Sequence, residues 1–292
     1  MSALTAALEG LRRVSRAPAL LAGVWVLTFA ISLPLAIVMR GMLADHLGRS
    51  LAADTALGGV NYEWMQEFAS QASGVGVTFR PTIIGFGALL DNLSAFVDAA
   101  ARPAVIVAAA AAYILVWLFL AGGIIDRLAR DRPSRAHGFF AACGVFFFRF
   151  LRLALAQAIV YGFLFGPMHR WLFDRLYPRM IHEVSVERTA FFARLVLYLV
   201  FGLLVAASAI VFDYAKVRAV VEDRRSMLGA INAAIGFIRR NYAAAVSLFA
   251  IDFLLFAAIV ALYALVAPGA GRTTMTIAIS VAIGQLYVVA RL

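Results

Sequence analysis

The sequence places one acidic side chain, Asp252, where an acid could do chemistry inside a membrane. It stands in "LFAIDFLLF", near the middle of an apolar run. An ionised carboxylate in hydrocarbon is costly unless it is paired, protonated or hydrated, so an intramembrane acid indicates a functional site by default. Proton or ion transfer is the chemistry that such a group performs. The alternative is a protonated or hydrogen-bonded Asp that only holds helices together.

Possible partners for Asp252 are polar side chains inside or near the edges of other apolar runs. They are Arg152, Gln157, Arg194 and Gln285. The sequence does not select among them, and the two glutamines are equally explained as hydrogen bonders between helices.

A second set of side chains suggests metal binding, because His169, His182 and Glu183 share one segment between apolar runs. No HExxH or CxxC spacing accompanies them, and the chain has no P-loop, GxSxG or EF-hand motif. We therefore expect no metal and no cofactor. An enzyme that acts on lipid is the weakest of the functional alternatives.

A charged cluster, Glu222, Asp223, Arg224 and Arg225, lies between two long apolar runs. It forms either a solvated turn or a binding site. Ser226 follows it and is placed to cap a helix, as is Ser134 earlier in the chain. Apolar residues recur at helical spacing from Met227 to Ile238, which predicts an amphipathic helix in the membrane interface.

The elements that position these groups are membrane spans. The chain of 292 residues is 64% hydrophobic and only 14% charged, which exceeds what a soluble domain can bury. About 20 apolar residues cross a bilayer. We predict an all-α polytopic membrane helix bundle, one domain over residues 1–292, with six spans at about 19–39, 105–125, 150–166, 190–212, 242–266 and 273–290.

Lys and Arg set the orientation of these spans. They concentrate in the amino terminus, in 127–152 and in 216–240, whereas residues 41–102 hold more acids than bases. This pattern predicts both termini in the cytoplasm, cytoplasmic elbows at 126–149 and 213–241, and an extracytoplasmic segment at 41–102. Within that segment, helices are expected over 86–98 and around "NYEWMQEFASQ", either packed at the interface or as a lid over a cavity.

The two elbows share residues at a constant spacing of 92. Asp131, Arg132 and Ser134 recur as Asp223, Arg224 and Ser226, and the following Ala-Ala pair and Gly recur as well. The pattern indicates a possible two-fold hairpin repeat. Gly122, Gly123, Gly202 and Gly284 are expected to permit close approach of helices.

The stretches "FLAGGIIDRLARDRP" and "DYAKVRAVVEDRRS", with the repeated hairpin, resemble uncharacterised bacterial six-span families. The hydropathy pattern and the elbows are similar to those of the membrane domain attached to some glycerophosphodiester phosphodiesterases. The chain lacks the barrel and the metal-binding acids of that enzyme. The resemblance therefore implies a bacterial inner-membrane protein of unassigned role.

The leading functional prediction is a non-enzymatic, multi-pass component of the cell envelope that binds, assembles with or supports other proteins or lipids. A transporter or channel-like protein that uses Asp252 is the alternative. The expected partners are the lipid bilayer, anionic headgroups and other membrane proteins. The net charge of +10 does not indicate nucleic acid, because the bases sit at the ends of apolar spans.

Overall fold

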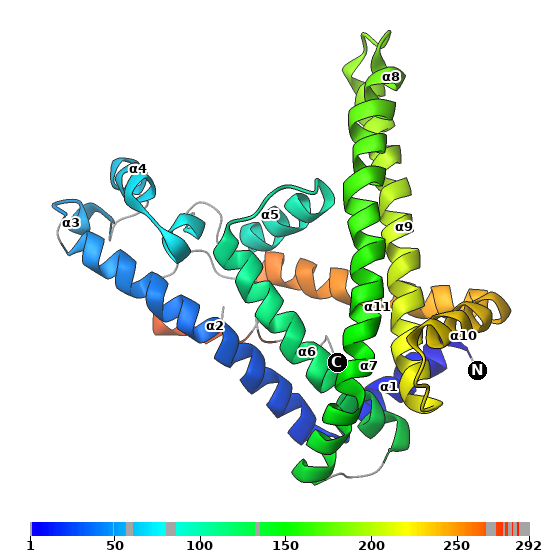
Figure 1. The fold of residues 1–292 in the computed structure, drawn as a ribbon. Coiled ribbons are helices and arrows are strands. Elements are labelled where there is room, and N and C mark those ends of the chain that lie inside the picture. Colours follow the sequence, from blue (N-terminus) through cyan, green and yellow to red (C-terminus); the bar gives the residue numbers. More distant parts are fainter. Residues whose placement is uncertain are drawn as a thin grey trace. The chain divides into compact units, whose positions relative to one another are not determined.

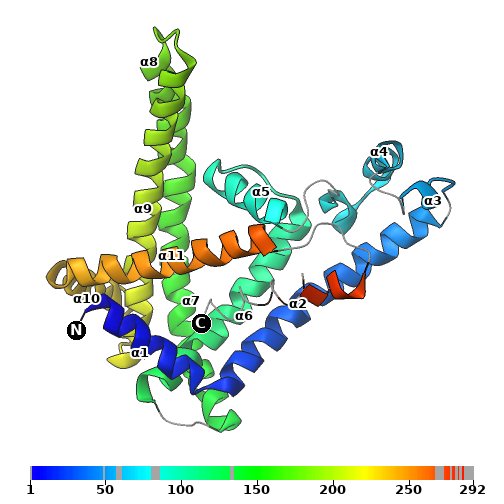
Figure 2. The ribbon, with the colours of Figure 1, turned by 180° about the vertical axis from the view of Figure 1, so that it is seen from behind.

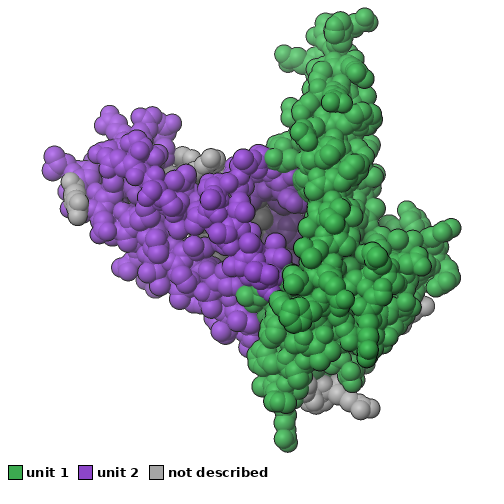
Figure 3. Space-filling model, in the orientation of Figure 1, with its two compact units in different colours: residues 1–16, 97–99, 116–253 green, residues 17–96, 100–115, 254–292 purple. Residues whose placement is uncertain are grey.

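All regular elements in the described residues are helices (Figure 1). The computed structural model describes residues 2–48, 50–56, 61–79, 86–131, 135–266, 273–276, 278–279, 282 and 285. By its internal contacts the chain divides into two compact units (Figure 3). Unit 1 contains residues 1–16, 97–99 and 116–253, and unit 2 contains residues 17–96, 100–115 and 254–292. The predicted all-α class is confirmed.

Five helices in the described part of the chain are long and apolar enough to cross a membrane. They are α2 (Pro18–Leu47), α6 (Ala104–Arg130), the helix Ala136–Ile181 that begins with α7 (Ala136–Phe163), α9 (Glu187–Val221) and α11 (Tyr242–Val266). Each exceeds the roughly 20 residues that a bilayer core requires. These helices indicate a multi-pass membrane protein. The sixth predicted span, 273–290, lies mostly outside the described residues.

The third span differs from its prediction at both ends. We expected an elbow over 126–149 and a span over 150–166, but helix α7 runs through residue 149 without a break. The helix also continues past Pro167 through η2 (Leu164–Met168), η3 (Trp171–Leu176) and α8 (Tyr177–Ile181). Proline lacks an N–H and clashes with the preceding turn. The wider π-helical turns of η2 and η3 accommodate it without ending the helix.

In unit 1, α7 and α9 form a long antiparallel hairpin, seen side by side in both ribbon views (Figures 1 and 2). Helix α10 (Met227–Arg240) packs across α9. The buried core at this end joins residues of α6, α7, α9 and α10, and includes Phe150, Ala215, Ala219, Ala230 and Ala234. Small side chains at these contacts let the helix backbones approach closely.

Helices α6 and α7 approach each other closely at Gly122 and Gly123, the glycine pair that the sequence singled out. A Cβ atom on Gly123 would lie 2.4 Å from the Sγ of Cys143 and 3.0 Å from the backbone oxygen of Phe139. One on Gly122 would lie 2.5 Å from the Cβ of Phe146. Only glycine fits at this crossing, as predicted for Gly122 and Gly123. A Cβ atom on Gly202 would have nothing within 4 Å among the described residues, so the close approach expected there is wrong. Gly284 lies outside the described residues.

Helix α10 has the predicted N-cap, but part of the face that we expected to contact lipid contacts protein instead. The Ser226 side chain accepts a hydrogen bond from the Gly229 N–H at 3.2 Å, so the predicted N-cap is present. Met227 and Ala234, which we expected to face lipid, are instead buried against neighbouring helices, while Leu228 stays exposed. Part of the amphipathic face therefore makes protein contacts.

Unit 2 contains α2 and the shorter helices α3 (Ala53–Ala56), α4 (Tyr62–Gln71), η1 (Gly74–Thr78) and most of α5 (Phe86–Val97). Both helices expected in the 41–102 segment are present. Trp64 and Phe68 of α4 are buried beside His46 at the end of α2. On α5, Leu90, Leu93 and Phe96 are exposed.

Candidate functional site

The charged elbow cluster forms a network of ion pairs that joins three helices of unit 1. Arg149 of α7 contacts Asp223 through its Nη1 atom, 2.6 Å from Oδ1. Arg218 and Arg224 both donate to the carboxylate of Glu222. Arg149 is mostly buried and lies over the ring of Phe146, 5.1 Å from its centroid. This network fixes the turn between α9 and α10 onto α7.

The electrostatics of the elbow follow from these contacts. Hydrogen bonds from Arg224 and Arg218 hold the pKa of the Glu222 carboxyl below its ordinary value. The hydrogen bond from Arg149, with its positive charge, lowers the pKa of Asp223. Both acids therefore remain ionised at neutral pH. Glu222, Asp223 and Arg224 make the contacts that hold the turn, while the exposed Arg225 acts on Asp223 through its charge.

The backbone at Asp223 ends α9 in a defined way. Asp223 has a φ of 47°, and the Arg224 N–H donates to the Ala219 oxygen at 3.0 Å. This is the hydrogen bond of a Schellman motif, with Asp at the position that usually holds Gly. Asp131, its counterpart 92 residues earlier, follows α6 and also has a φ of 47°.

The two copies of the possible hairpin repeat differ in structure after the turns at Asp131 and Asp223. In the first copy α7 passes through Arg149, whereas in the second α10 ends at Arg240 and Asn241 precedes α11. Residues 132–134, including the expected cap Ser134, lie outside the described residues. The hairpin repeat therefore stays a prediction, with one shared backbone feature in its favour.

Asp252 lies on the part of α11 that belongs to unit 1. It interacts electrostatically with Asp213 and Tyr214 of α9. Asp213 also binds Lys216, with 2.7 Å between Oδ1 and Nζ. The sequence did not predict an acidic neighbour for Asp252, because helix packing alone brings these two segments together.

The predicted partners of Asp252 make other contacts. Arg152 donates to the Phe148 oxygen of its own helix at 3.2 Å, and Gln157 of the same helix is half-buried. Gln285, in unit 2, accepts a hydrogen bond from the Trp25 Nε1 atom at 2.5 Å. Within the described residues, no hydrogen bond or ion pair joins Asp252 to any of the four.

Arg194, the fourth predicted partner, lies in a polar cluster in the other half of the α7–α9 hairpin. Its guanidinium donates to the Tyr198 hydroxyl at 3.0 Å. That hydroxyl donates to Oδ1 of Asp98 at 2.5 Å. His169 Nε2 lies 3.1 Å from the Val97 oxygen. These contacts fix residues 97–99 onto the hairpin, which is a structural role.

The three possible metal ligands do not share a loop. His169 lies between the π-helical turns η2 and η3, while His182 and Glu183 lie in the turn after α8. His182 follows His169 by thirteen positions, and the twelve residues between them are helical, so the two lie about 20 Å apart at the α-helical rise. No group of three or more His, Cys, Asp or Glu side chains suited to a metal occurs among the described residues.

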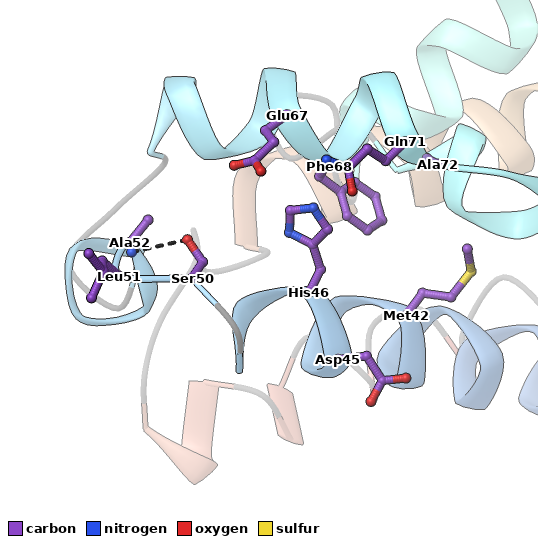
Figure 4. A pocket seen from close by; sticks show the side chains of 10 residues that line it. All are labelled: Met42, Asp45, His46, Ser50, Leu51, Ala52, Glu67, Phe68, Gln71 and Ala72. Carbon is purple, nitrogen blue, oxygen red and sulfur yellow. Dashed lines mark hydrogen bonds between the residues drawn. The ribbon is translucent and has the colours of Figure 1, made fainter.

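A pocket that the sequence did not reveal lies in unit 2, between the end of α2 and α4 (Figure 4). It has a volume of about 680 Å³ and polar side chains from both helices. In Figure 4 His46 rises from α2 toward Phe68 of α4, and Glu67 lies beside them. The remaining lining residues are Met42, Asp45, Ser50, Leu51, Ala52, Gln71 and Ala72.

A hydrogen bond from Trp64 orients the ring of His46. Trp64 Nε1 donates to His46 Nδ1 at 2.9 Å, and an indole N–H can only donate. The Nδ1 atom of His46 is therefore the acceptor. The pocket is thus lined by carboxylate and imidazole groups that suit a small polar ligand. The i, i+4 spacing of Trp64 and Phe68 was the one sequence signal for this packing.

In the part of the chain that the structure describes, the fold is all-helical, with five helices of membrane-spanning length and a charged elbow packed at one end of a helical hairpin. Comparison of the chain with protein-family models, curated proteins and solved structures gives no match.

Proposed function

We propose that this chain is a non-enzymatic, multi-pass protein of the bacterial inner membrane that binds or supports other envelope proteins or lipids. The outer face of α9 carries the proposal. Phe191, Leu195, Leu199 and Leu203 recur every four residues along it and are exposed, with Leu203 at 70%. Leu197 and Phe201 of the same helix are buried, at 4% and 2%. The exposed stripe suits acyl chains or an apolar partner helix.

Contacts within unit 1 support the proposed topology, with both termini in the cytoplasm. Arg13 of α1 (Ala3–Ser15) donates to the Leu128 oxygen near the end of α6 at 3.0 Å. Arg130 at that helix end interacts electrostatically with Asp223 of the elbow. Three basic segments assigned to one side of the membrane are thus neighbours, which agrees with the positive-inside rule.

Transport through Asp252 is the second candidate function, and one observation favours it. Helix α9 brings Asp213 and Tyr214 into electrostatic range of Asp252. Two carboxylates on neighbouring helices can share a proton, which is a common element of proton relays.

Site-specific photo-crosslinking in native membranes tests the leading proposal. A photoreactive residue at Leu203 should form adducts with a second polypeptide or with lipid, and the mass of the adduct separates the two. The same residue at Leu197 is the matched control and should give only links within the chain. If Leu203 also links only within the chain, the outer face of α9 is not a binding surface and the proposal is wrong.

A further inference from the structure

Helix α1 has an apolar stripe that the described residues of the protein leave exposed. Leu4, Leu8 and Leu11 follow the i, i+4, i+7 spacing of one helix face and are exposed at 61%, 58% and 67%. The helix itself is well defined, since the Ser2 side chain accepts from the Thr5 N–H at 3.2 Å as an N-cap.

Residues outside the leucine stripe attach α1 to the rest of the protein. Val14 is buried, and the Arg13 guanidinium donates to the Leu128 oxygen of α6 at 3.0 Å. Glu9 accepts from Arg12 and Arg13, which lowers the pKa of its carboxyl. Arg12 and Arg16 remain exposed beside the leucine stripe. Helix α1 is therefore amphipathic, with an uncovered apolar face next to positive charge.

The contact with α6 indicates the depth at which α1 lies relative to a membrane. Helix α6 ends with Arg127 and Arg130, and bases at the end of a spanning helix lie at the headgroups. Helix α2 begins at Pro18, three residues after α1 ends. Helix α1 is thus attached near the ends of two spanning helices, where the bilayer surface lies.

We propose that α1 lies in the bilayer interface, with Leu4, Leu8 and Leu11 among the acyl chains and Arg12 and Arg16 on anionic lipid headgroups. Charge complementarity selects this occupant. An apolar helix face flanked by arginines suits a negatively charged lipid surface, and the attraction adds to the burial of apolar area. The inference rests on the membrane location proposed above, but not on any protein partner.

Labelling the full-length chain in vesicles tests this placement. In a Cys143→Ala background, an environment-sensitive fluorophore is attached at Leu11→Cys or at Thr5→Cys. Both positions are exposed, and six residues at about 100° per residue place them about 120° apart around α1, so position 5 lies off the leucine stripe. With anionic vesicles, the label at position 11 should be blue-shifted and quenched several-fold more by lipid-attached quenchers than the label at position 5. Neutral vesicles and high salt should reduce the difference.

The outcomes separate this inference from the proposed function. Flotation of each labelled chain with the vesicles tests membrane location by itself. If the chain floats but both labels are quenched equally by aqueous iodide, α1 does not enter the interface. A label at position 11 shielded from lipid and water alike reveals a protein partner and overturns the proposal. Equal quenching in neutral and anionic vesicles overturns the role of Arg12 and Arg16.

Discussion

Arg149 and Asp223 form an ion pair, 2.6 Å between Nη1 and Oδ1, that joins the middle of α7 to the turn after α9. The same guanidinium nitrogen lies 3.4 Å from the Arg224 oxygen. Arg149 thus connects the α7–α9 hairpin to the charged cluster Glu222–Arg225. The elbow is held by side chains of two helices as well as by its own hydrogen bonds.

Replacing Asp223 by Asn should lower the melting temperature slightly at neutral pH, because the ion pair is lost. Arg149 lowers the pKa of Asp223, so the pair contributes stability above the ordinary value of 3.8. This contribution disappears as the pH falls through the lowered pKa of the folded state. Thermal unfolding in detergent from pH 7 to below pH 3.8 should therefore show the two melting temperatures converge.

Asp131→Asn is the matched control for that measurement. Asp131 has the same φ of 47°, and Asn tolerates this conformation as well as Asp does. The substitution at 131 should therefore leave the melting temperature nearly unchanged at every pH. A pH-independent loss in Asp223→Asn would show that backbone strain, not charge, is responsible.

Gly123→Ala should destabilise the crossing of α6 and α7 by about 1–3 kcal/mol, because a new Cβ would overlap the Cys143 sulfur. Gly144→Ala, one residue from Cys143, adds the same atom where nothing lies within 4 Å. The control should be neutral or stabilise α7 by up to about 1 kcal/mol. Unfolding by denaturant in mixed micelles measures both, and equal effects would contradict the tight crossing.

The sequence predicts the parts of this fold that depend on local pattern. Hydropathy locates five apolar helices of spanning length, with wrong bounds for the third, and residue type locates the Ser226 cap and the Gly122–Gly123 crossing. It fails where tertiary packing overrides a local signal. Pro167 indicates the end of a helix, yet π-helical turns carry the helix on to Ile181. The apolar face of α10 indicates lipid contact, yet Ala234 packs against protein.

Ser226→Ala should cost about 0.5–2 kcal/mol, because the Gly229 N–H loses its side-chain acceptor at the start of α10. Ser226→Asn keeps an acceptor in the same place and serves as the control. Chemical unfolding with a helix-sensitive probe measures the difference. If both variants lose the same amount of stability, the Ser226 hydroxyl is not the group that caps the start of α10.

Trp64→Phe should destabilise unit 2 by about 1 kcal/mol, since His46 Nδ1 loses its donor while the stacked ring beside Phe68 is kept. The comparison variant is Trp171→Phe, because Trp171 is 48% exposed. Limited proteolysis of the 41–79 region reports the loss locally. Unchanged protection in Trp64→Phe would show that the hydrogen bond does not hold α4 onto α2.

Sequence reasoning identified the charged elbow because its members are consecutive, so their proximity needed no tertiary information. The surroundings of Asp252 and the His46 pocket required packing between distant segments. Asp213 and Asp252 are separated by a turn and a whole helix, and His46 meets Trp64 only after the chain reverses. No periodicity within one segment encodes such pairs.

Asp252→Asn distinguishes the two proposed functions. Asp252 and Asp213 repel each other when both are ionised, so removing one charge should maintain or raise the melting temperature. If the chain is a binding or support component, ion and proton flux in reconstituted liposomes should not differ between the variant and the native chain. Asp213→Asn removes the same repulsion but also breaks the ion pair with Lys216, so it should stabilise less. Flux that the native chain carries and Asp252→Asn abolishes, with folding intact, would favour transport. A marked fall in melting temperature would instead show that Asp252 makes a stabilising contact between helices.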